Sequence, residues 1–390
     1  MPIRRSLLVL AYFAFISLGL PDGLLGVGWP SIRTDFGVAT ESVGLLLFAG
    51  TAGYLTSSVA AGFTIARVGV GWLLAGSTAM ASTALAGYAL SPGLAPMVGF
   101  ALLAGFGGGA IDAGLNAYAA GAFGPRHMNW LHAFFGLGVA IGPLIMTGVI
   151  GAGLSWRWGY GIVATAQALL ATAFVLTARS WGERPLPVST GQEPAGSWKT
   201  LAIPAVWLGV LAFGVYVAIE VGAGLWAFLL LTESRGVSDT VAGLCVSGYW
   251  ASLFVGRVVQ GVVAERLGST RVLVGSLTGM AVGSLLVAVP GPGWLAVTGL
   301  VIIGFAAAPV FPLLTLTTAD RVGAAHADRA IGMQIAGAGL GGAVIPSGIG
   351  VLLSRVGVEA LGPALLVLSL LLLGLYAIFH RQARVTALSR

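Results

Sequence analysis

Charged side chains are scarce in this sequence, and their scarcity decides the class of protein. Only 8% of the 390 residues are Asp, Glu, Lys or Arg, whereas soluble globular proteins carry about 25%. Hydrophobic residues make up 57% of the chain, and the mean hydropathy is +0.97. The composition therefore predicts a membrane protein that crosses the bilayer many times.

The sequence also lacks the features of several other classes. The single cysteine, Cys245, lies in an apolar run and excludes an intrachain disulfide. We find no His/Cys metal cluster, no nucleophile–base pair and no phosphate-binding glycine loop followed by Lys, so we expect no enzyme, metal or cofactor. The net charge of +6 comes from arginines scattered at the ends of apolar runs. This pattern argues against a nucleic-acid partner.

Twelve apolar runs are long enough to cross a membrane. They lie near 6–30, 41–65, 71–91, 95–121, 128–152, 158–180, 201–231, 240–264, 271–290, 293–318, 329–353 and 361–380. The first run follows Arg4 and Arg5 without a convincing cleavage site, so we expect a retained helix rather than a signal peptide. The polar, proline-containing stretch 181–200 separates two halves, 1–180 and 201–390. We therefore predict an all-α fold with six spans in each half and a cytoplasmic linker.

Lys and Arg side chains gather in alternate loops. With the N-terminus inside, 14 of them fall in cytoplasmic segments, and four fall outside: Arg33, Arg157, Arg235 and Arg355. This bias predicts that both termini are cytoplasmic, and we expect the protein in the inner (cytoplasmic) membrane.

The two halves share two short patterns. GFTIARVG begins at Gly62 and GVVAERLG begins at Gly261, so Gly, Arg and Gly align at one offset of 199 residues. GLGVAIGP ends at Pro143, and GLGGAVIP ends at Pro346. Two matches in the same order indicate an internal duplication. Two six-helix halves around a substrate site near the midplane are typical of one large class of transporters.

The first of these patterns resembles the signature loop of the major facilitator superfamily, G-x-x-x-[acid]-R-x-G, between spans 2 and 3 and spans 8 and 9. The second copy has Glu265 and Arg266, whereas the first copy has Ala66 before Arg67. The resemblance implies the fold of that superfamily and transport by alternating access. It also implies a gating or structural role for Arg67, Glu265 and Arg266.

Four charged side chains lie inside the predicted spans: Asp22, Asp112, Glu220 and Arg257. A carboxylate at membrane depth costs roughly 2.5–3.5 kcal/mol on insertion scales, so it needs a partner, water or a proton. Asp112 and Asn116 are one helical turn apart and share a helix face. Gly105 and Gly109 in the same span would let another helix approach closely. We predict that Asp112 is a functional carboxylate rather than an interhelical packing contact.

Two further carboxylates are candidates for proton coupling. Asp22 lies between Pro21 and Gly23, which would loosen the helix and free backbone groups to line a cavity. The alternative is that Asp22 caps a helix break near the outer surface. Glu220 lies mid-span, one turn after Tyr216, and the alternative there is a packing contact between the halves.

Other residues are predicted to bind substrate or to gate. Arg257 is expected to snorkel or to brace the loop at Glu265. His132 lies near the start of span 5, where an interfacial role is the alternative.

Amide, phenol and indole groups suit a hydroxyl-rich ligand, although anchoring at the membrane interface is the alternative for any Trp. Such groups occur at Asn116, Tyr216, Trp226, Trp250 and Gln334. Pro309 and Pro312 predict a kink in span 10 that could gate one side.

A finer resemblance concerns the fucose permease branch of proton-coupled sugar symporters. That branch has an acid in span 1, an acid followed four residues later by Asn in span 4, and an N-x-x-[polar] pattern leading span 5. Asp22, Asp112 with Asn116, and Asn129 with His132 fall on those positions. The resemblance implies that both acids couple to protons and contact sugar, and that His132 contacts sugar. The span-4 acid is Glu in the fucose transporter and Asp here, so the sugar stays open.

The first hypothesis is a proton-coupled symporter of a sugar or related polyol. A desolvated carboxyl group favours its neutral form, so Asp22, Asp112 or Glu220 could load a proton on one side and release it on the other. The alternative is a proton-coupled antiporter that exports a drug-like or amphipathic molecule. GLGVAIGPL partly resembles an antiporter motif, but span 4 has no Arg. A receptor or membrane enzyme has no supporting feature. We expect a monomer whose partners are a small molecule, protons and lipid.

Overall fold

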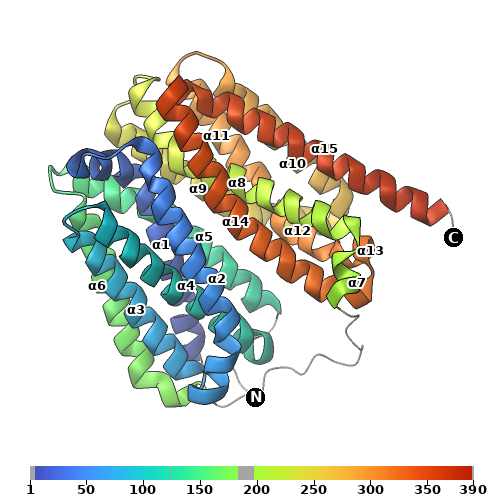
Figure 1. Ribbon diagram of the computed structural model, residues 1–390, viewed down its shortest axis with the longest axis horizontal. Coiled ribbons are helices and arrows are strands. Elements are labelled where there is room, and N and C mark those ends of the chain that lie inside the picture. Colours follow the sequence, from blue (N-terminus) through green and yellow to red (C-terminus); the bar gives the residue numbers. More distant parts are fainter. Residues whose placement is uncertain (1–4, 124, 183–196, 389–390) are drawn as a thin grey trace. The chain divides into compact units, whose positions relative to one another are not determined.

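The computed structural model describes residues 5–123, 125–182 and 197–388, and Figure 1 shows that they form helices joined by short turns. Within this part of the chain, twelve helical segments are long and apolar enough to cross a membrane. This confirms the number predicted from the sequence. The ends of the segments differ from the predicted ends by a few residues in both directions, since helix ends are the least precisely predicted part of a span.

The helices of the first half are long and consecutive. They are α1 (Arg5–Phe36), α2 (Val43–Val68), α3 (Val70–Leu90), α4 (Leu94–Ala122), α5 (Pro125–Gly151) and α6 (Arg157–Thr177). The second half begins with the short α7 (Ser197–Leu201). It continues with α8 (Pro204–Glu233), α9 (Asp239–Leu267), α10 (Ser269–Ala288), α11 (Gly293–Ala307), α12 (Val310–Leu316), α13 (Thr318–Val322), α14 (Ala324–Val356) and α15 (Leu361–Leu388). Residues 183–196 of the predicted linker lie outside the described part of the chain.

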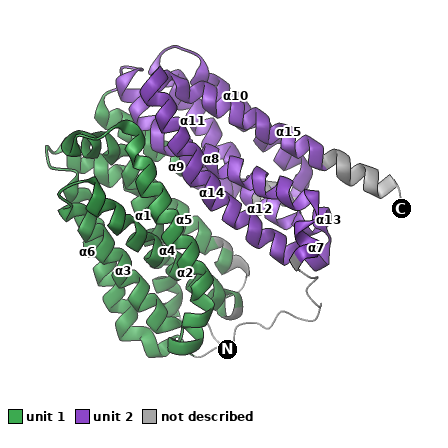
Figure 2. Cartoon of the chain, in the orientation of Figure 1, with its two compact units in different colours: residues 1–188, 238–250 green, residues 189–237, 251–390 purple. Residues whose placement is uncertain are grey.

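The chain divides into two compact units (Figure 2). Unit 1 contains residues 1–188 and 238–250, and unit 2 contains residues 189–237 and 251–390. Helix α9 therefore contributes its first part to unit 1 and the remainder to unit 2.

Corresponding helices pack together in the two units. In unit 1, α1 packs on α5 and α3 packs on α6. In unit 2, α8 packs on α14 and α10 packs on α15. Glycines allow the first contact of each set: a Cβ added at Gly138 would lie 2.1 Å from the Ile16 carbonyl oxygen, and one at Gly341 would lie 2.3 Å from that of Gly214. Gly138 and Gly341 belong to the duplicated GLG patterns, so the sequence repeat corresponds to a repeated helix–helix contact.

The duplicated loops also share their backbone conformation. Gly69 joins α2 to α3 with φ 80° and ψ 163°, and Gly268 joins α9 to α10 with φ 83° and ψ 147°. A positive φ of this size favours glycine, because a Cβ would be strained there. The second glycine of each signature loop is therefore explained by the turn itself.

Prolines act differently in different helices. Helix α1 continues through Pro21, and α5 continues through Pro143. Asp22 consequently lies within a helix and does not cap a break. In span 10 the predicted interruption is present, because α11 ends at Ala307 and α12 begins after Pro309.

Candidate functional site

Asp112 lies in a half-buried polar cluster of unit 1. The Tyr54 hydroxyl of α2 donates a 2.6 Å hydrogen bond to Asp112 Oδ2, and Asn116 Nδ2 donates a 2.9 Å bond to Asp112 Oδ1. The predicted proximity of Asp112 and Asn116 is thus confirmed. Among the described residues, the Asp112 carboxylate receives hydrogen bonds only from these two neutral donors. Both donors are neutral dipoles, and no cation in the described part of the chain is bonded to this carboxylate.

Glycines of α4 bring Tyr54 to Asp112. A Cβ added at Gly105 would lie 2.0 Å from the Gly50 carbonyl oxygen, and one at Gly109 would lie 2.3 Å from that of Tyr54. The predicted small-residue contact therefore exists, and its partner is α2. With the two backbones this close, the phenol reaches the carboxylate one turn further along α4.

Asp22 and His132 lie on the neighbouring helices α1 and α5. The Asp22 side chain is exposed, and its carboxylate is within electrostatic reach of Tyr54, which also bonds to Asp112. His132 is exposed, and its ring contacts Phe15 edge-on, with the ring centroids 5.4 Å apart. The side chain of Asn129, the other half of the predicted span-5 pattern, lies outside the described residues.

Glu220 lies in a different kind of cluster in unit 2. The Tyr216 hydroxyl, one turn earlier on α8, donates a hydrogen bond to Glu220 Oε2. Arg257 of α9 forms an ion pair with Glu220, with Nη2 3.9 Å from Oε1. The two side chains are 23% and 14% exposed, so the pair is largely withdrawn from water. Glu220 therefore has a cationic partner as well as a neutral one.

The structure gives Arg257 a partner that was not predicted. We expected this guanidinium to snorkel or to brace the loop at Glu265; the structure pairs it with Glu220, and the contact with Glu265 stays a prediction. Helix α9 turns Arg257 toward α8, and a carboxylate in the span is a stronger partner for a desolvated cation than distant water. The side chain of Glu265 lies outside the described residues.

Three predicted substrate contacts are buried. Trp226 is 1% exposed, and its Nε1 donates a 3.0 Å hydrogen bond to the Pro346 carbonyl, so α8 and α14 enclose it. Gln334 is 0% exposed; its Oε1 accepts a 3.0 Å bond from Thr318, whereas its Nε2 has no hydrogen-bond partner among the residues that the structure describes. Trp250 is 8% exposed and contacts Tyr249 edge-on. In this conformation these side chains contribute to packing.

The predicted gating residues lie at helix ends and at the break in span 10. Arg67 and Arg266 are exposed in the last turns of α2 and α9. Pro309 is buried at the start of α12, and Pro312 is exposed within α12. Their gating roles stay predictions.

Sequence reasoning missed Tyr54 and the partner of Arg257. Tyr54 lies in an apolar span among small residues, next to Gly53, whose added Cβ would lie 2.2 Å from the Leu102 carbonyl oxygen. The sequence feature that could have indicated Tyr54 is its position next to Gly53, a glycine at which two helices approach closely. No local pattern connects Arg257 to Glu220, because the contact joins two helices.

Comparisons with known proteins decide the family. The sequence matches the Major Facilitator Superfamily over residues 11–236 and 218–388. The chain belongs to this superfamily. It is therefore a secondary transporter and a multi-pass membrane protein, not an enzyme. No group of three or more potential metal ligands occurs among the described residues of this transporter.

Individual relatives of this major facilitator protein are distant. It is 22% identical over 355 residues to the glucose/mannose transporter GlcP of Bacillus subtilis, covering 89% of this chain and 88% of that protein. It is 26% identical over 312 residues to an uncharacterized transporter of Yersinia pestis, covering 77% of each.

Solved structures share the fold at lower identity. A bacterial homolog of the human lysosomal transporter Spinster, in an inward-facing and occupied conformation, has a TM-score of 0.80 and 14% identity, covering 98% of this chain and 97% of that chain. A variant of the nucleoside transporter NupG has a TM-score of 0.75 and 15% identity, covering 95% and 98%. These similarities establish the major facilitator fold.

Proposed function

We propose that this transporter carries a sugar or related polyol together with protons, and that Asp112 binds the coupled proton. The observation that carries the proposal is the pair of neutral donors on Asp112. Protonation of Asp112 breaks no ion pair, and the hydroxyl of Tyr54 and the amide of Asn116 can rearrange around a neutral carboxyl group. Protonation of Asp112 therefore separates no pair of opposite charges, in contrast to protonation of a carboxylate that is paired with a cation.

Glu220 differs in this respect. Its carboxylate lies beside the Arg257 guanidinium, so removing either charge would leave the other without its partner. We therefore assign the coupled proton to Asp112. Glu220 and Arg257 form a charge-balanced pair that orders α8 and α9 within unit 2.

The sugar assignment rests on chemistry and on one relative. The proposed contacts of Asp112, Asn116 and His132 offer carboxylate, amide and imidazole groups, which together accept and donate hydrogen bonds as sugar hydroxyls require. The similarity to a glucose/mannose transporter extends over 89% of the chain. Hexoses are therefore the first substrates to test.

The proposed orientation follows the positive-inside bias. Both termini lie in the cytoplasm, the two halves 1–180 and 201–390 are joined on the cytoplasmic side, and the protein lies in the cytoplasmic membrane as a monomer. Alternating access comes from movement of one half against the other.

Uptake by purified protein in proteoliposomes tests the proposal. Labelled hexoses and pentoses are supplied outside with an imposed inward proton gradient, and the same vesicles with a protonophore serve as the control. We expect one or more sugars to accumulate above equilibrium, and Asp112→Asn to abolish accumulation. Full proton-driven uptake by Asp112→Asn would contradict the assignment of the proton. Proton release driven by hydrophobic cations, without sugar uptake, would instead establish the alternative drug-exporting antiporter.

A further inference from the structure

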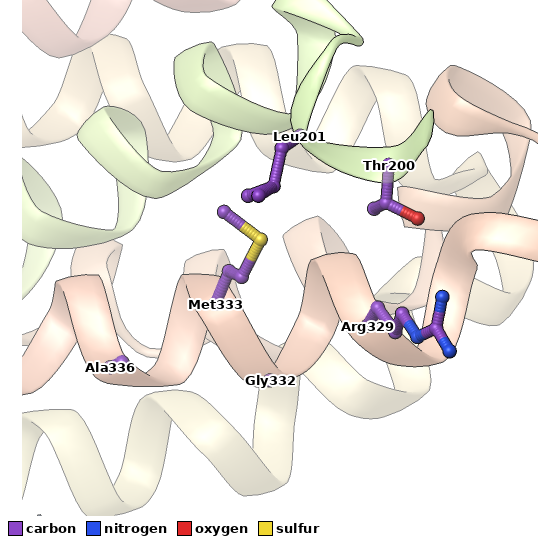
Figure 3. A pocket seen from close by; sticks show the side chains of 6 residues that line it. All are labelled: Thr200, Leu201, Arg329, Gly332, Met333 and Ala336. Carbon is purple, nitrogen blue, oxygen red and sulfur yellow. The ribbon is translucent and has the colours of Figure 1, made fainter. Parts of the chain in front are cut away.

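An open pocket in unit 2 lies beside the first turns of α14. Its volume is about 380 Å³, and it is lined by Thr200, Leu201, Arg329, Gly332, Met333 and Ala336. Figure 3 shows the Leu201 and Met333 side chains pointing toward each other, with the Arg329 guanidinium on the side of Thr200. A 2.9 Å hydrogen bond between Thr200 and His326 Nδ1 joins α7 to the start of α14. This hydrogen bond therefore links Thr200, a residue of the pocket wall, to α14, the helix that carries Arg329.

Within the described ranges, no protein group is bonded to Arg329, the cation of this pocket. Arg329 Nη1 is buried without a hydrogen bond, and Arg329 has no ion pair among the described residues. Asp328 is its neighbour in sequence, but adjacent residues on a helix do not face each other. A guanidinium whose nitrogen is shielded from water and protein acceptors is unfavourable unless an anion contacts it.

The remaining lining is apolar, and the surroundings are typical of a membrane interface. Leu201, Met333 and Ala336 contribute hydrocarbon to the pocket. Trp198 and Trp207 nearby are 84% and 52% exposed, and Trp207 Nε1 donates a 2.9 Å bond to the Leu201 carbonyl. Exposed tryptophans at the ends of spans are typical of the headgroup region. The pocket therefore offers a cation next to hydrocarbon at the depth of lipid headgroups.

We propose that this pocket binds an anionic phospholipid of the leaflet in which α8 and α14 begin. Arg329 contacts the phosphate, since a guanidinium donates two parallel hydrogen bonds to phosphate oxygens. Leu201 and Met333 contact the glycerol and the first methylenes of the acyl chains. The exposed Lys199 adds a second positive charge at the same end of the unit. Inorganic phosphate is also an anion, but it would leave the apolar wall of the pocket in contact with water.

Lipid binding to the full-length protein in neutral detergent tests this proposal by native mass spectrometry. The probes are phosphatidylglycerol, phosphatidylcholine with the same acyl chains, and inorganic phosphate. We expect phosphatidylglycerol to bind the wild type about tenfold more tightly than phosphatidylcholine, and Arg329→Gln to remove this preference. Arg355→Gln is the matched control, because it removes an exposed arginine at the opposite end of α14 and should keep the preference.

Arg329→Lys keeps the charge and serves as a second variant if Arg329→Gln fails to fold. We expect it to retain a weaker preference, since an ammonium group loses the paired geometry. Equal binding of the two lipids by the wild type, or an unchanged preference in Arg329→Gln, would overturn the proposal. Displacement of phosphatidylglycerol by an equal concentration of inorganic phosphate would assign the site to free phosphate and would overturn the lipid assignment.

Discussion

Asp112 of unit 1 and Glu220 of unit 2 both lie in membrane-spanning helices, but their partners differ in charge. Asp112 receives hydrogen bonds from a phenol and an amide, whereas Glu220 receives one from a phenol and is paired with Arg257. The difference shows that two acids in membrane-spanning helices can have partners of different charge. Our proposal assigns the coupled proton to the acid with neutral donors and a structural role to the acid paired with a guanidinium.

The largest expected effect separates the two acids directly. Asp112→Asn should abolish accumulation above equilibrium while exchange of labelled substrate continues, because the coupling proton has no binding site. Glu220→Gln should lower the amount of folded protein, yet the remaining transport should still depend on the proton gradient. The measurement is gradient-driven uptake relative to equilibrium exchange in the same proteoliposomes. Gradient dependence lost in Glu220→Gln and kept in Asp112→Asn would reverse the comparison.

The ion pair of unit 2 can be tested by a double-mutant cycle. Arg257→Gln should destabilise the protein by about 2 kcal/mol, less than a fully buried pair, because Glu220 keeps its charge and loses its cation. The double variant Arg257→Gln/Glu220→Gln should recover most of this loss, since both charges are then absent. Thermal unfolding in detergent measures Arg257→Gln, Glu220→Gln and the double variant against the wild type. Simple additivity of the two single changes would show that the pair contributes no coupling.

The next largest effect is a loss of stability, expected where α2 and α4 approach closely in unit 1. Gly105→Ala should destabilise by about 1–3 kcal/mol, because its Cβ would meet the Gly50 carbonyl oxygen. Gly99→Ala is the control on the same helix, since a Cβ at this exposed position has no neighbour within 4 Å. Unfolding temperatures of the two variants provide the comparison. An equal effect at both glycines would mean that helix propensity, rather than contact, determines the result.

The smallest expected effect concerns the two phenols. Tyr54→Phe removes one of two donors to Asp112, and we expect gradient-driven uptake to fall about fivefold, the effect of one hydrogen bond worth roughly 1 kcal/mol. Tyr216→Phe removes a donor to Glu220, which keeps Arg257, so uptake should fall less. Initial uptake rates at a fixed gradient measure both. A larger loss in Tyr216→Phe would indicate that the unit 2 cluster lies closer to the rate-limiting step.

The sequence was sufficient for contacts within one helix. Twelve spans were predicted from apolar runs, and the pairing of Asp112 with Asn116 followed from their spacing of one turn. The same spacing relates Tyr216 to Glu220. Such contacts are predictable because helix geometry fixes which residues share a face.

Contacts between helices were harder to predict. The glycines of α4 indicated that a helix approaches, but they did not identify α2 or bring Tyr54 to Asp112. The pairing of Arg257 with Glu220 was missed for the same reason: Glu220 lies on α8, and no local spacing relates two residues on different helices. Packing of separate helices depends on many side chains at once, so a single sequence determines it only weakly.

Both clusters share one feature that bears on the transport cycle. Asp112 has Asn116 on its own helix, and Glu220 has Tyr216 on its own helix, so these partners travel with the carboxylate whenever the helix moves. Tyr54 and Arg257 lie on other helices, but each belongs to the same unit as its acid. A movement of one half against the other as a body would therefore leave both sets of contacts intact. Such a movement would change which side of the membrane reaches each acid and would not change the groups bonded to it.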